Sequence, residues 1–332
     1  MGMAVTSDAA GAASRPFLVV NPRSAGGGTG RRWESIESRV RGVLGDVSVG
    51  MTAGPMDAVR LTREALRAGH RTVLAVGGDG TINEVVNGFF DDEGLPIAPG
   101  ASLGLLPAGT GGDFRRTVAV PLELDATLSA LASAKPRLID VGRVRFVGHD
   151  GRPTMRHFIN VTSFGISGAV ADRVNASSKR LGRLSFTLGS LQALAGWSDV
   201  DVRVSVDDGP AQTLAVTCLA AANGRFFGGG MMVAPDARLD DGLLHVTVWA
   251  GYGLGTFIFR QPGIYSGAHL GWSGTRSMVA RSLRLESDAR VLVDVDGEQP
   301  GTLPATVELL PKAIGFLSCR ALGGREGPLR RR

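Results

Sequence analysis

The chain has 332 residues, of which 43% are hydrophobic and 20% charged, so it can bury a core as one large domain or as two. This composition excludes a disordered chain, and because no run of about 18 apolar residues exists, it also excludes a helix that spans a bilayer. The net charge of +5 suits a polyanionic ligand or an anionic membrane surface, although a solvated arginine-rich surface gives the same excess. Cys218 and Cys319 are expected to be buried, reduced thiols, with a disulfide as the alternative.

Both ends of the chain have the composition of mobile segments. Residues 1–15 are rich in Ala, Gly and Ser and are expected to form a disordered arm. This arm lacks the basic start and the continuous apolar segment of a signal peptide. It does contain the myristoylation pattern M-G-x-x-x-[ST] through Gly2 and Thr6, but that pattern is common by chance. Residues 323–332 are expected to form a flexible basic tail.

Between residues 16 and 137 the sequence alternates short apolar segments with segments of helical spacing. The expected strands are 17–20, 72–78 and 102–106, and the expected helices are 31–44, 54–69, 81–90 and 122–134. Strands that alternate with helices predict a parallel sheet covered on both faces. We therefore assign residues 16–137 to an α/β domain, and the glycine loops described below make it the candidate nucleotide-binding domain.

After residue 138 the pattern changes to successive β-like segments, most of them with alternating polar and apolar residues. Residues 138–307 are therefore predicted to form a mainly antiparallel β-sandwich, interrupted by helical candidates at 170–197 and 254–269. The last apolar segment returns to the first domain in this prediction, so residues 308–322 are assigned to it. The β-like segments are 138–147, 155–166, 202–208, 213–224, 243–250, 281–287 and 289–298.

Three glycine-rich loops follow Val20, Val76 and Leu106, each at the carboxyl end of an expected strand. Ligands of parallel sheets bind at these ends, so the loops could line one crevice. A helix that begins at such a loop exposes free N–H groups, which bind phosphate when glycines allow a close approach. A tight turn is the alternative for any single loop, and none of the three is a Walker A loop.

The second loop, GGDGTINE at residues 77–84, has the parts of a phosphate site: open backbone, the Thr81 hydroxyl and the Asn83 amide. Asp79 would repel a phosphate directly. We expect it to act through Mg²⁺, through water or through a neighbouring side chain.

The longer segment GGDGTINEVVNG resembles the signature of the diacylglycerol kinase catalytic domain family, which includes bacterial lipid kinases and sphingosine and ceramide kinases. The resemblance extends in order from about residue 17 to 317. It implies an N-terminal parallel α/β domain of the NAD-kinase and diacylglycerol-kinase type, followed by an antiparallel β-sandwich. The other matching segments are NPRSAGGG, TAGPMDA, LPAGTGGDF, NGRFFGGGMMVAPDARLDDGLLHV and VDVDGE.

The resemblance implies roles for individual residues, position by position. Asp296 would match the catalytic base, with Glu298 beside it. In the turn ARLDDGLL, Asp241 would supply a metal-ligand side chain while Arg238 and Leu243 supply backbone carbonyls, a set of oxygen ligands that suits Mg²⁺ or Ca²⁺. The nucleotide would contact Asn21, Thr52, Gly77, Gly78, Asp79, Gly80, Thr81, Asn83, Glu84, Thr110 and Asp113.

Both acidic motifs also have a purely structural interpretation. The Asp-Gly pair in DVDGE favours a type I′ hairpin turn, and LDDGLL is also a good turn sequence. Arg115 and Arg116 could meet phosphate or form a solvated helix start. The chain departs from the family at Gly112, where asparagine is usual, and at Ser167, where an acid is common. The first departure could weaken ATP binding.

The sequence indicates the molecule that accepts the phosphoryl group less directly than it indicates the nucleotide. The apolar segments 184–197 and 254–272 could form a lipid cleft or a surface anchor, with Trp197 and Trp272 at an interface, or they could be ordinary core helices. The leading hypothesis is a cytoplasmic ATP- and Mg²⁺-dependent kinase of diacylglycerol or a related lipid alcohol, in peripheral contact with the inner membrane surface. The oligomeric state does not follow from the sequence, with a homodimer as one option, and nucleic acid is not an expected partner.

Two alternatives stay open at this point. One is a soluble kinase of the NAD-kinase type, which the DGE motif and the second-domain segment disfavour. The other is a catalytically weak lipid- or nucleotide-binding protein, which Gly112 suggests.

Overall fold

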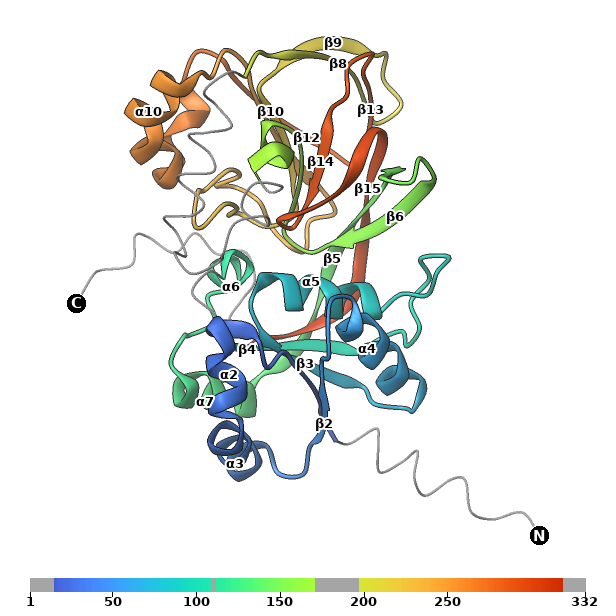
Figure 1. Cartoon of the computed structure of the whole chain (residues 1–332), viewed down its shortest axis with the longest axis vertical. Helices are drawn as coiled ribbons and strands as arrows, with labels where there is room; N and C mark the ends of the chain where they lie inside the picture. The colour runs from blue at the N-terminus through green and yellow to red at the C-terminus, as the bar shows by residue number, and fades with distance from the viewer. Residues whose placement is uncertain (1–14, 109–111, 171–196, 319–332) are drawn as a thin grey trace.

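A computed structural model describes residues 15–108, 112–170 and 197–318. Residues 15–135 contain a parallel sheet flanked by helices, and the later residues contain mainly antiparallel strands (Figure 1). The predicted fold class, an α/β domain followed by a β-sandwich, is therefore confirmed. Thr110, Cys319, the basic tail and most of the helical candidate at 170–197 lie outside the described residues, as does nearly all of the predicted arm.

The first sheet contains four parallel strands in the order β4-β3-β1-β2. They are β1 (Phe17–Val20), β2 (Ser48–Met51), β3 (Thr72–Gly77) and β4 (Ser102–Pro107). Strand β2 was missed from the sequence because it is only SVGM, a short segment with a central glycine and no apolar run. The helices are α2 (Gly28–Arg31), α3 (Trp33–Leu44), α4 (Asp57–Arg67), α5 (Asp79–Gly88), α6 (Asp113–Thr117) and α7 (Leu124–Ser133), with a 3₁₀ turn, η1, at Ser24–Gly27.

The continuous apolar runs of β1 and β3 are explained by burial on both faces of this sheet. Successive strand residues point to opposite sides, so Val19 packs into the core that contains α4 and α5 residues. Its neighbours Leu18 and Val20 pack into a second core with Trp33 and Leu128 from α3 and α7. A two-sided core requires apolar residues at every position, which is the pattern typical of a parallel sheet.

The second half is built from short antiparallel strands, with two long strands that continue into the first sheet. The expected segments 155–166 and 213–224 each divide into two strands, and β12 was not anticipated. The strands are β5 (Lys135–Gly148), β6 (Pro153–Phe158), β7 (Val161–Gly165), β8 (Val200–Val206), β9 (Gln212–Val216), β10 (Cys218–Ala222), β11 (Leu244–Trp249), β12 (Thr275–Ala280), β13 (Ser282–Glu286), β14 (Leu292–Val295) and β15 (Glu298–Ser318). Helix α10 (Leu254–Ser266) and the 3₁₀ turn η3 (Ala268–Gly271) lie between β11 and β12.

Strands β5 and β15 connect the two halves of the molecule (Figure 1). Their antiparallel ladder runs from Gly301 paired with Gly148 in the sandwich to Ser318 paired with Lys135 near the α/β domain. At that end β15 also pairs in parallel with β4, at Gly315 and Phe316. The described strands consequently form one continuous sheet. None of the described helices is long and apolar enough to cross a membrane.

Helix α5, which begins at the second glycine loop, packs directly against α4 at Gly88. A Cβ at this position would lie 2.4 Å from the Thr62 Cβ and 2.8 Å from the Val59 carbonyl oxygen. The backbone oxygen cannot move away without disturbing α4. The last glycine of GGDGTINEVVNG is therefore explained by close helix packing.

We expect Gly88→Ala to lower the free energy of unfolding by about 1–3 kcal/mol through overpacking. The measurement is urea denaturation at neutral pH. Gly42→Ala is the matched control, because Gly42 lies in α3 at a position where a Cβ would meet nothing within 4 Å, so alanine should be neutral or slightly stabilising there. Equal effects of the two substitutions would contradict this packing explanation.

Candidate functional site

The glycine loops meet at one edge of the parallel sheet. The backbone N–H of Asn21, after β1, donates to the Val76 carbonyl of β3 at 3.0 Å. The Thr52 N–H, after β2, donates to the Val20 carbonyl at 2.8 Å. The loop after β4 continues this edge, since its Ala108 N–H donates to the Gly77 carbonyl at 2.9 Å. The structure thus brings together the predicted nucleotide-contacting residues of four strand ends.

The GGDGT turn is shaped by contacts between its own residues and the first loop. The Asn21 side-chain amide donates to the Thr81 hydroxyl at 3.0 Å. A Cβ at Gly77 would lie 2.4 Å from the same hydroxyl oxygen, so only glycine fits there. Helix α5 begins at Gly78, where no side chain caps the first N–H groups. These N–H groups form the kind of helix start that binds phosphate.

Asp79 holds the third glycine loop. Its carboxylate accepts hydrogen bonds from the backbone N–H groups of Gly112 at 2.9 Å, Asp113 at 3.1 Å and Phe114 at 3.4 Å. The negative charge therefore caps the start of α6. From the sequence, Asp79 was expected to act through a metal, water or a side chain; its partners in this structure are backbone groups of the neighbouring loop.

The same contacts explain how glycine replaces asparagine at position 112. Gly112 has φ = +92° and ψ = +57°, a left-handed conformation at the start of α6. Glycine and asparagine are the residues that most readily adopt this conformation. The Gly112 N–H still binds Asp79, so the loop keeps its attachment without an asparagine side chain.

Asp113 joins the α/β domain to the sandwich. Its carboxylate accepts one hydrogen bond from the Gly229 N–H at 2.8 Å and another from Arg116 at 2.7 Å. Burial, and after it the nearby Asp79, raises the pKa of Asp113 to about 6. Arg115 donates to the Val120 carbonyl, so both arginines have partners close to α6.

Asp296 occupies a two-residue hairpin turn between β14 and β15. Asp296 and Gly297 both have positive φ, +50° and +92°, and the flanking Val295 and Glu298 pair across the turn. Positive φ at both central residues is the type I′ signature, so the hairpin interpretation of DVDGE describes the backbone. This turn directs the Asp296 carboxylate back toward the β6–β7 connection.

Four donors surround the Asp296 carboxylate. The backbone N–H groups of Ile159, Asn160 and Val161 donate at 2.9, 3.1 and 2.9 Å. The Asn83 amide of α5 donates at 2.9 Å. Burial raises the pKa of Asp296 to about 6, although these hydrogen bonds act in the opposite direction.

A second contact between the domains explains the two asparagines of the signature, Asn83 and Asn87. Both side-chain amides donate to the His157 carbonyl, at 3.0 and 2.9 Å, and Asn87 accepts from the His157 N–H at 2.9 Å. The His157 ring stacks on Phe90 with 3.9 Å between centroids, and burial lowers the pKa of this imidazole to about 3. Helix α5 is therefore fastened to the end of β6.

The two glutamates of the predicted site, Glu84 and Glu298, lie near the first turns of α4 and α5. Glu84 accepts from the Ala58 N–H at 3.2 Å, in the first turn of α4. A Cβ on Gly80 would lie 3.8 Å from a Glu298 carboxylate oxygen, which places Glu298 at the helix start. Arg156 on β6 interacts electrostatically with both glutamates, and burial lowers its pKa. No sequence pattern had singled out this arginine.

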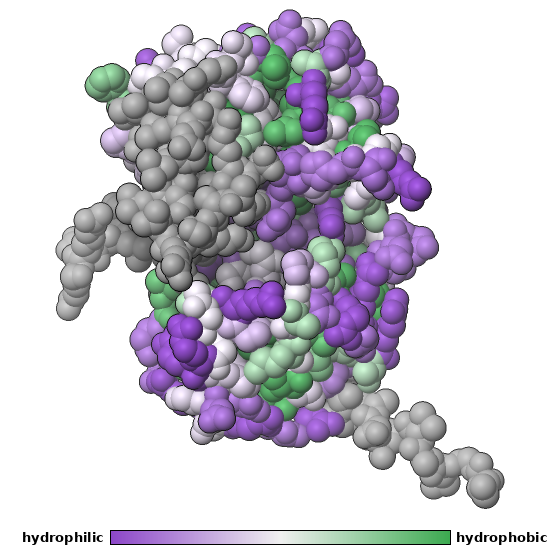
Figure 2. All heavy atoms as spheres, viewed as in Figure 1, coloured by the Kyte–Doolittle hydropathy of each residue, from purple (hydrophilic) through white to green (hydrophobic). Residues whose placement is uncertain are grey.

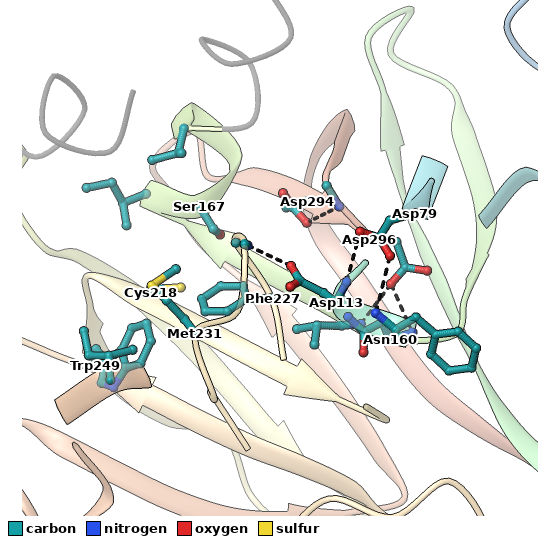
Figure 3. Close-up of a pocket in the computed structure, with 18 of the residues that line it drawn as sticks. Asp79, Asp113, Asn160, Ser167, Cys218, Phe227, Met231, Trp249, Asp294 and Asp296 are labelled. Atoms are coloured by element: carbon teal, nitrogen blue, oxygen red, sulfur yellow. Dashed lines mark hydrogen bonds between the residues drawn. The ribbon is translucent and has the colours of Figure 1, made fainter. Parts of the chain in front are cut away.

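The acids line a cavity of about 270 Å³ between the two halves of the molecule (Figure 3). Asp79, Asp113 and Asp296 gather at one end, while Cys218, Met231 and Trp249 lie at the other. The apolar end is built from residues of the sandwich and α10. Its lining residues include Val170, Phe227, Tyr252 and Ile264.

Asp294 also lines this cavity, and it was missed from the sequence. It lies two residues before Asp296, and strand alternation in VDVDGE was the signal that could have placed both acids on one side. The Gly297 N–H donates to its Oδ1 at 3.1 Å. Burial raises the pKa of Asp294 to about 8, with smaller contributions from the negative charges of Asp296 and Glu298.

The predicted metal-binding turn lies before β11, at residues 238–243. The Asp241 carboxylate accepts from the Leu243 N–H at 3.1 Å, and its other oxygen lies 3.4 Å from His245 Nε2. Asp140 of β5 fastens the turn by accepting from the Gly242 N–H at 2.8 Å. Within the described ranges no group of three or more His, Cys, Asp or Glu side chains is placed to hold a metal. The predicted set contains a single carboxylate with two backbone carbonyls.

The fold and the site define a two-domain protein, with a parallel α/β domain, a β-sandwich and a cavity between them. Residues 15–144 match the diacylglycerol kinase catalytic domain, and residues 160–318 match the YegS C-terminal NAD kinase beta sandwich-like domain. These two matches confirm the resemblance to the diacylglycerol kinase catalytic domain family that the sequence motifs predicted.

Individual relatives agree with this assignment. A Chromohalobacter salexigens protein named "Probable lipid kinase YegS-like" is 34% identical over 63% of this chain and 64% of its own length. The chain therefore spans less than two thirds of that relative. A Mycobacterium tuberculosis protein named "Diacylglycerol kinase" is 27% identical over 80% of this chain and 82% of its own. A solved Bacillus anthracis structure shares the fold, with a TM-score of 0.72 at 23% identity, over 92% of this chain and 97% of that one.

The raised pKa values of Asp113, Asp294 and Asp296 predict that stability falls as the pH rises. For Asp294 the ordinary value is 3.8 and the folded value about 8. Between these values the unfolded chain releases the proton while the folded protein keeps it, so the free energy of unfolding decreases with pH, by an amount on the order of a few kcal/mol. Urea denaturation at pH 5, 7 and 8.5 measures this decrease.

Asp294→Asn should flatten the decrease between pH 6 and 8.5, because the amide does not titrate. Asp208→Asn, at an exposed turn position, is the control and should leave it unchanged. A variant at 294 with the full wild-type pH dependence would show that another group is responsible.

Proposed function

We propose that this protein is an ATP-dependent lipid kinase that transfers the γ-phosphoryl group of ATP to the hydroxyl of diacylglycerol or a related lipid alcohol. The observation that carries the proposal is the cavity, which joins an acidic end at Asp296 to an apolar end at Trp249. A lipid alcohol has the same division, with one polar hydroxyl and long apolar chains. A dinucleotide such as NAD has a charged pyrophosphate, two riboses and two heteroaromatic rings, but no long hydrocarbon chain to fill the apolar end.

The nucleotide would bind along the edge formed by the glycine loops. The open start of α5 at Gly78 would face its phosphates, with Asn21, Thr52 and Thr81 beside it. The remaining predicted contacts are Gly77, Asp79, Gly80, Asn83, Glu84, Thr110 and Asp113. Phosphoryl transfer depends mainly on positioning and charge neutralisation, and Mg²⁺ would enter with ATP as part of the substrate.

Asp296 is the proposed base. Its pKa of about 6 leaves it mostly ionised at neutral pH yet basic enough to share a proton with an attacking hydroxyl. Since a carboxylate offers about four lone-pair sites, the hydroxyl must replace one of the four present donors. Asn83 is the side-chain donor of the four and also donates to the His157 carbonyl, so it is the donor best able to release. Glu298, at the GGDGT turn, is proposed to assist.

A divalent metal at the turn before β11 is part of the same proposal. Asp241 would supply a carboxylate oxygen, and Arg238 and Leu243 would supply carbonyl oxygens. One carboxylate with additional oxygen ligands suits a hydrated Mg²⁺, and Ca²⁺ is the alternative. Such a metal would stabilise the turn that Asp140 already fastens.

We test the function with radiolabelled ATP and a panel of diacylglycerol, ceramide, sphingosine and NAD. Diacylglycerol or another lipid alcohol should be labelled, and NAD should not. Labelling of NAD alone would favour the NAD-kinase alternative, and tight ATP binding without any product would favour a binding protein.

Asp296→Asn should abolish transfer, a loss of at least about a hundredfold in kcat, because the amide cannot accept the proton. MgATP binding measured by calorimetry should stay within about twofold of the wild type, since the glycine loops lie in the other domain. Circular dichroism confirms that the variant is folded. Near-normal turnover in Asp296→Asn would contradict the assignment of Asp296 as the base.

Peripheral membrane contact is proposed through α10. Phe259 on this helix is 87% exposed, and the Arg260 guanidinium lies over the Trp272 ring at 5.2 Å from its centroid. The surface at α10 is pale to green in Figure 2, and Ile264 of the same helix lines the cavity. Helix α10 therefore connects an exposed aromatic and a cation to the wall of the proposed lipid site. The proposed location is cytoplasmic, at the inner membrane surface.

Phe259→Asp should weaken binding to phosphatidylglycerol vesicles about tenfold, because burial of a Phe side chain contributes about 1.5–3 kcal/mol. Vesicle cosedimentation measures the change. Leu95→Asp is the matched control, since Leu95 is an exposed apolar residue of the α/β domain. Equal losses in both variants would point to a general charge effect and would contradict docking through α10.

A further inference from the structure

The Asp294 carboxyl lines this site, but the proposed phosphoryl transfer gives it no role. It lies on β14, beside the Asp296 turn, and its residue is only 8% exposed, with its remaining surface in the cavity (Figure 3). Counting only bonds between described residues, Asp296 accepts four hydrogen bonds, whereas the Asp294 carboxyl accepts one, from the Gly297 N–H to Oδ1. Among the described residues no protein donor reaches its Oδ2. The Asp294 side chain lines the cavity beside the Asp296 turn (Figure 3).

The surroundings of Asp294 keep this carboxyl in its acid form. None of the described residues that line the cavity is Lys or Arg. Among the described residues, the ionisable groups nearby are Asp296 and Glu298 at the adjacent turn, Cys218 from β10, and Asp79 and Asp113 at the same end of the cavity as Asp296. The carboxyl groups disfavour a further negative charge close to them. None of these groups can supply a positive charge to pair with it. At neutral pH, with a pKa of about 8, Asp294 therefore presents an O–H donor to the cavity.

We propose that Asp294 is a specificity-determining residue that donates a hydrogen bond to an ester carbonyl of the acceptor lipid. The inference rests on the proposed lipid kinase function and narrows it to acyl-ester alcohols of the glycerolipid class. No bond is made or broken at Asp294. Asp294 recognises the ester carbonyl next to the reacting hydroxyl.

The spacing of the two acids fits such a lipid. Asp294 lies on β14 and Asp296 lies two residues further on, in the turn that follows this strand, and both residues line the cavity. In a diacylglycerol the free hydroxyl oxygen is five bonds from the nearest ester carbonyl oxygen, so one molecule can reach both Asp296 and Asp294. An ester carbonyl only accepts hydrogen bonds, and Asp296 has no proton to offer as a base. The donor must therefore come from another group, and Asp294 supplies it beside the apolar wall that would hold the chains.

The test compares two acceptors that differ only in this carbonyl, dioctanoylglycerol and 1,2-di-O-octylglycerol, in identical mixed micelles at pH 7. The wild type should prefer the ester by about five- to tenfold in kcat/KM, expressed mainly in KM, which is the size expected for one hydrogen bond. Asp294→Leu should bring the ester down to the level of the ether. Asp294→Asn, whose amide can accept from Gly297 and donate to the carbonyl, should restore most of the preference.

The ether lipid is the internal control, because a misfolded site or a steric clash lowers the use of both lipids. Equal losses for the two in Asp294→Leu would assign Asp294 a structural role and overturn the proposal. An ester preference that survives in Asp294→Leu would also overturn the proposal. A higher kcat/KM of the wild type for sphingosine than for dioctanoylglycerol would overturn it as well.

Failure of the proposed function gives a different result, in which the wild type phosphorylates neither lipid. The preference is then measured by binding, from the change in tryptophan fluorescence on addition of each lipid, since Trp249 lines the cavity. Ester binding that exceeds ether binding in the wild type but not in Asp294→Leu would support the inference without catalysis. No difference between the lipids would reject it.

Discussion

The arrangement of this site depends on the hydrogen bonds that surround the Asp296 carboxylate. This side chain begins at a hairpin turn of the sandwich and accepts from the β6–β7 connection and from Asn83 of the α/β domain. Because α5 starts at the GGDGT turn, the same contact places that turn relative to the acid. The phosphate-type loop and the proposed base are thus positioned by one buried charge.

Other contacts between the halves are also made by polar groups with few alternatives. Asp113 accepts from the Gly229 N–H, and Asn87 binds the His157 backbone and so fastens α5 to β6. A buried polar group that loses its partner is costly, so each contact strongly favours one relative placement of the domains. The β5–β15 ladder supplies a rigid connection behind them. Together they leave a cavity with acids at one end and apolar side chains at the other.

Each acid in this cavity has a different set of donors, and this difference separates their roles. Asp79 caps a helix, Asp113 pairs with Arg116, and Asp296 is surrounded by four donors. Among the described residues Asp294 has one donor, and burial raises its pKa to about 8, above the values of about 6 for Asp113 and Asp296. Carboxyl groups in similar sequence motifs can therefore serve as a tether, a base or a neutral donor, depending on burial and partners.

The sequence by itself determined the fold class and the position of the strand-end loops, because apolar runs and glycine loops report burial and turn geometry locally. It also pointed to Asp296 and to the signature asparagines. Tertiary structure alone decided that Asp79 binds backbone of the third loop, that Gly112 keeps its attachment through a left-handed backbone, and that Asp294 faces the cavity. Asp79 and Gly112 are 33 positions apart, and the Asn83–Asp296 contact joins residues 213 positions apart. No local pattern encodes which distant donors will surround a carboxyl group.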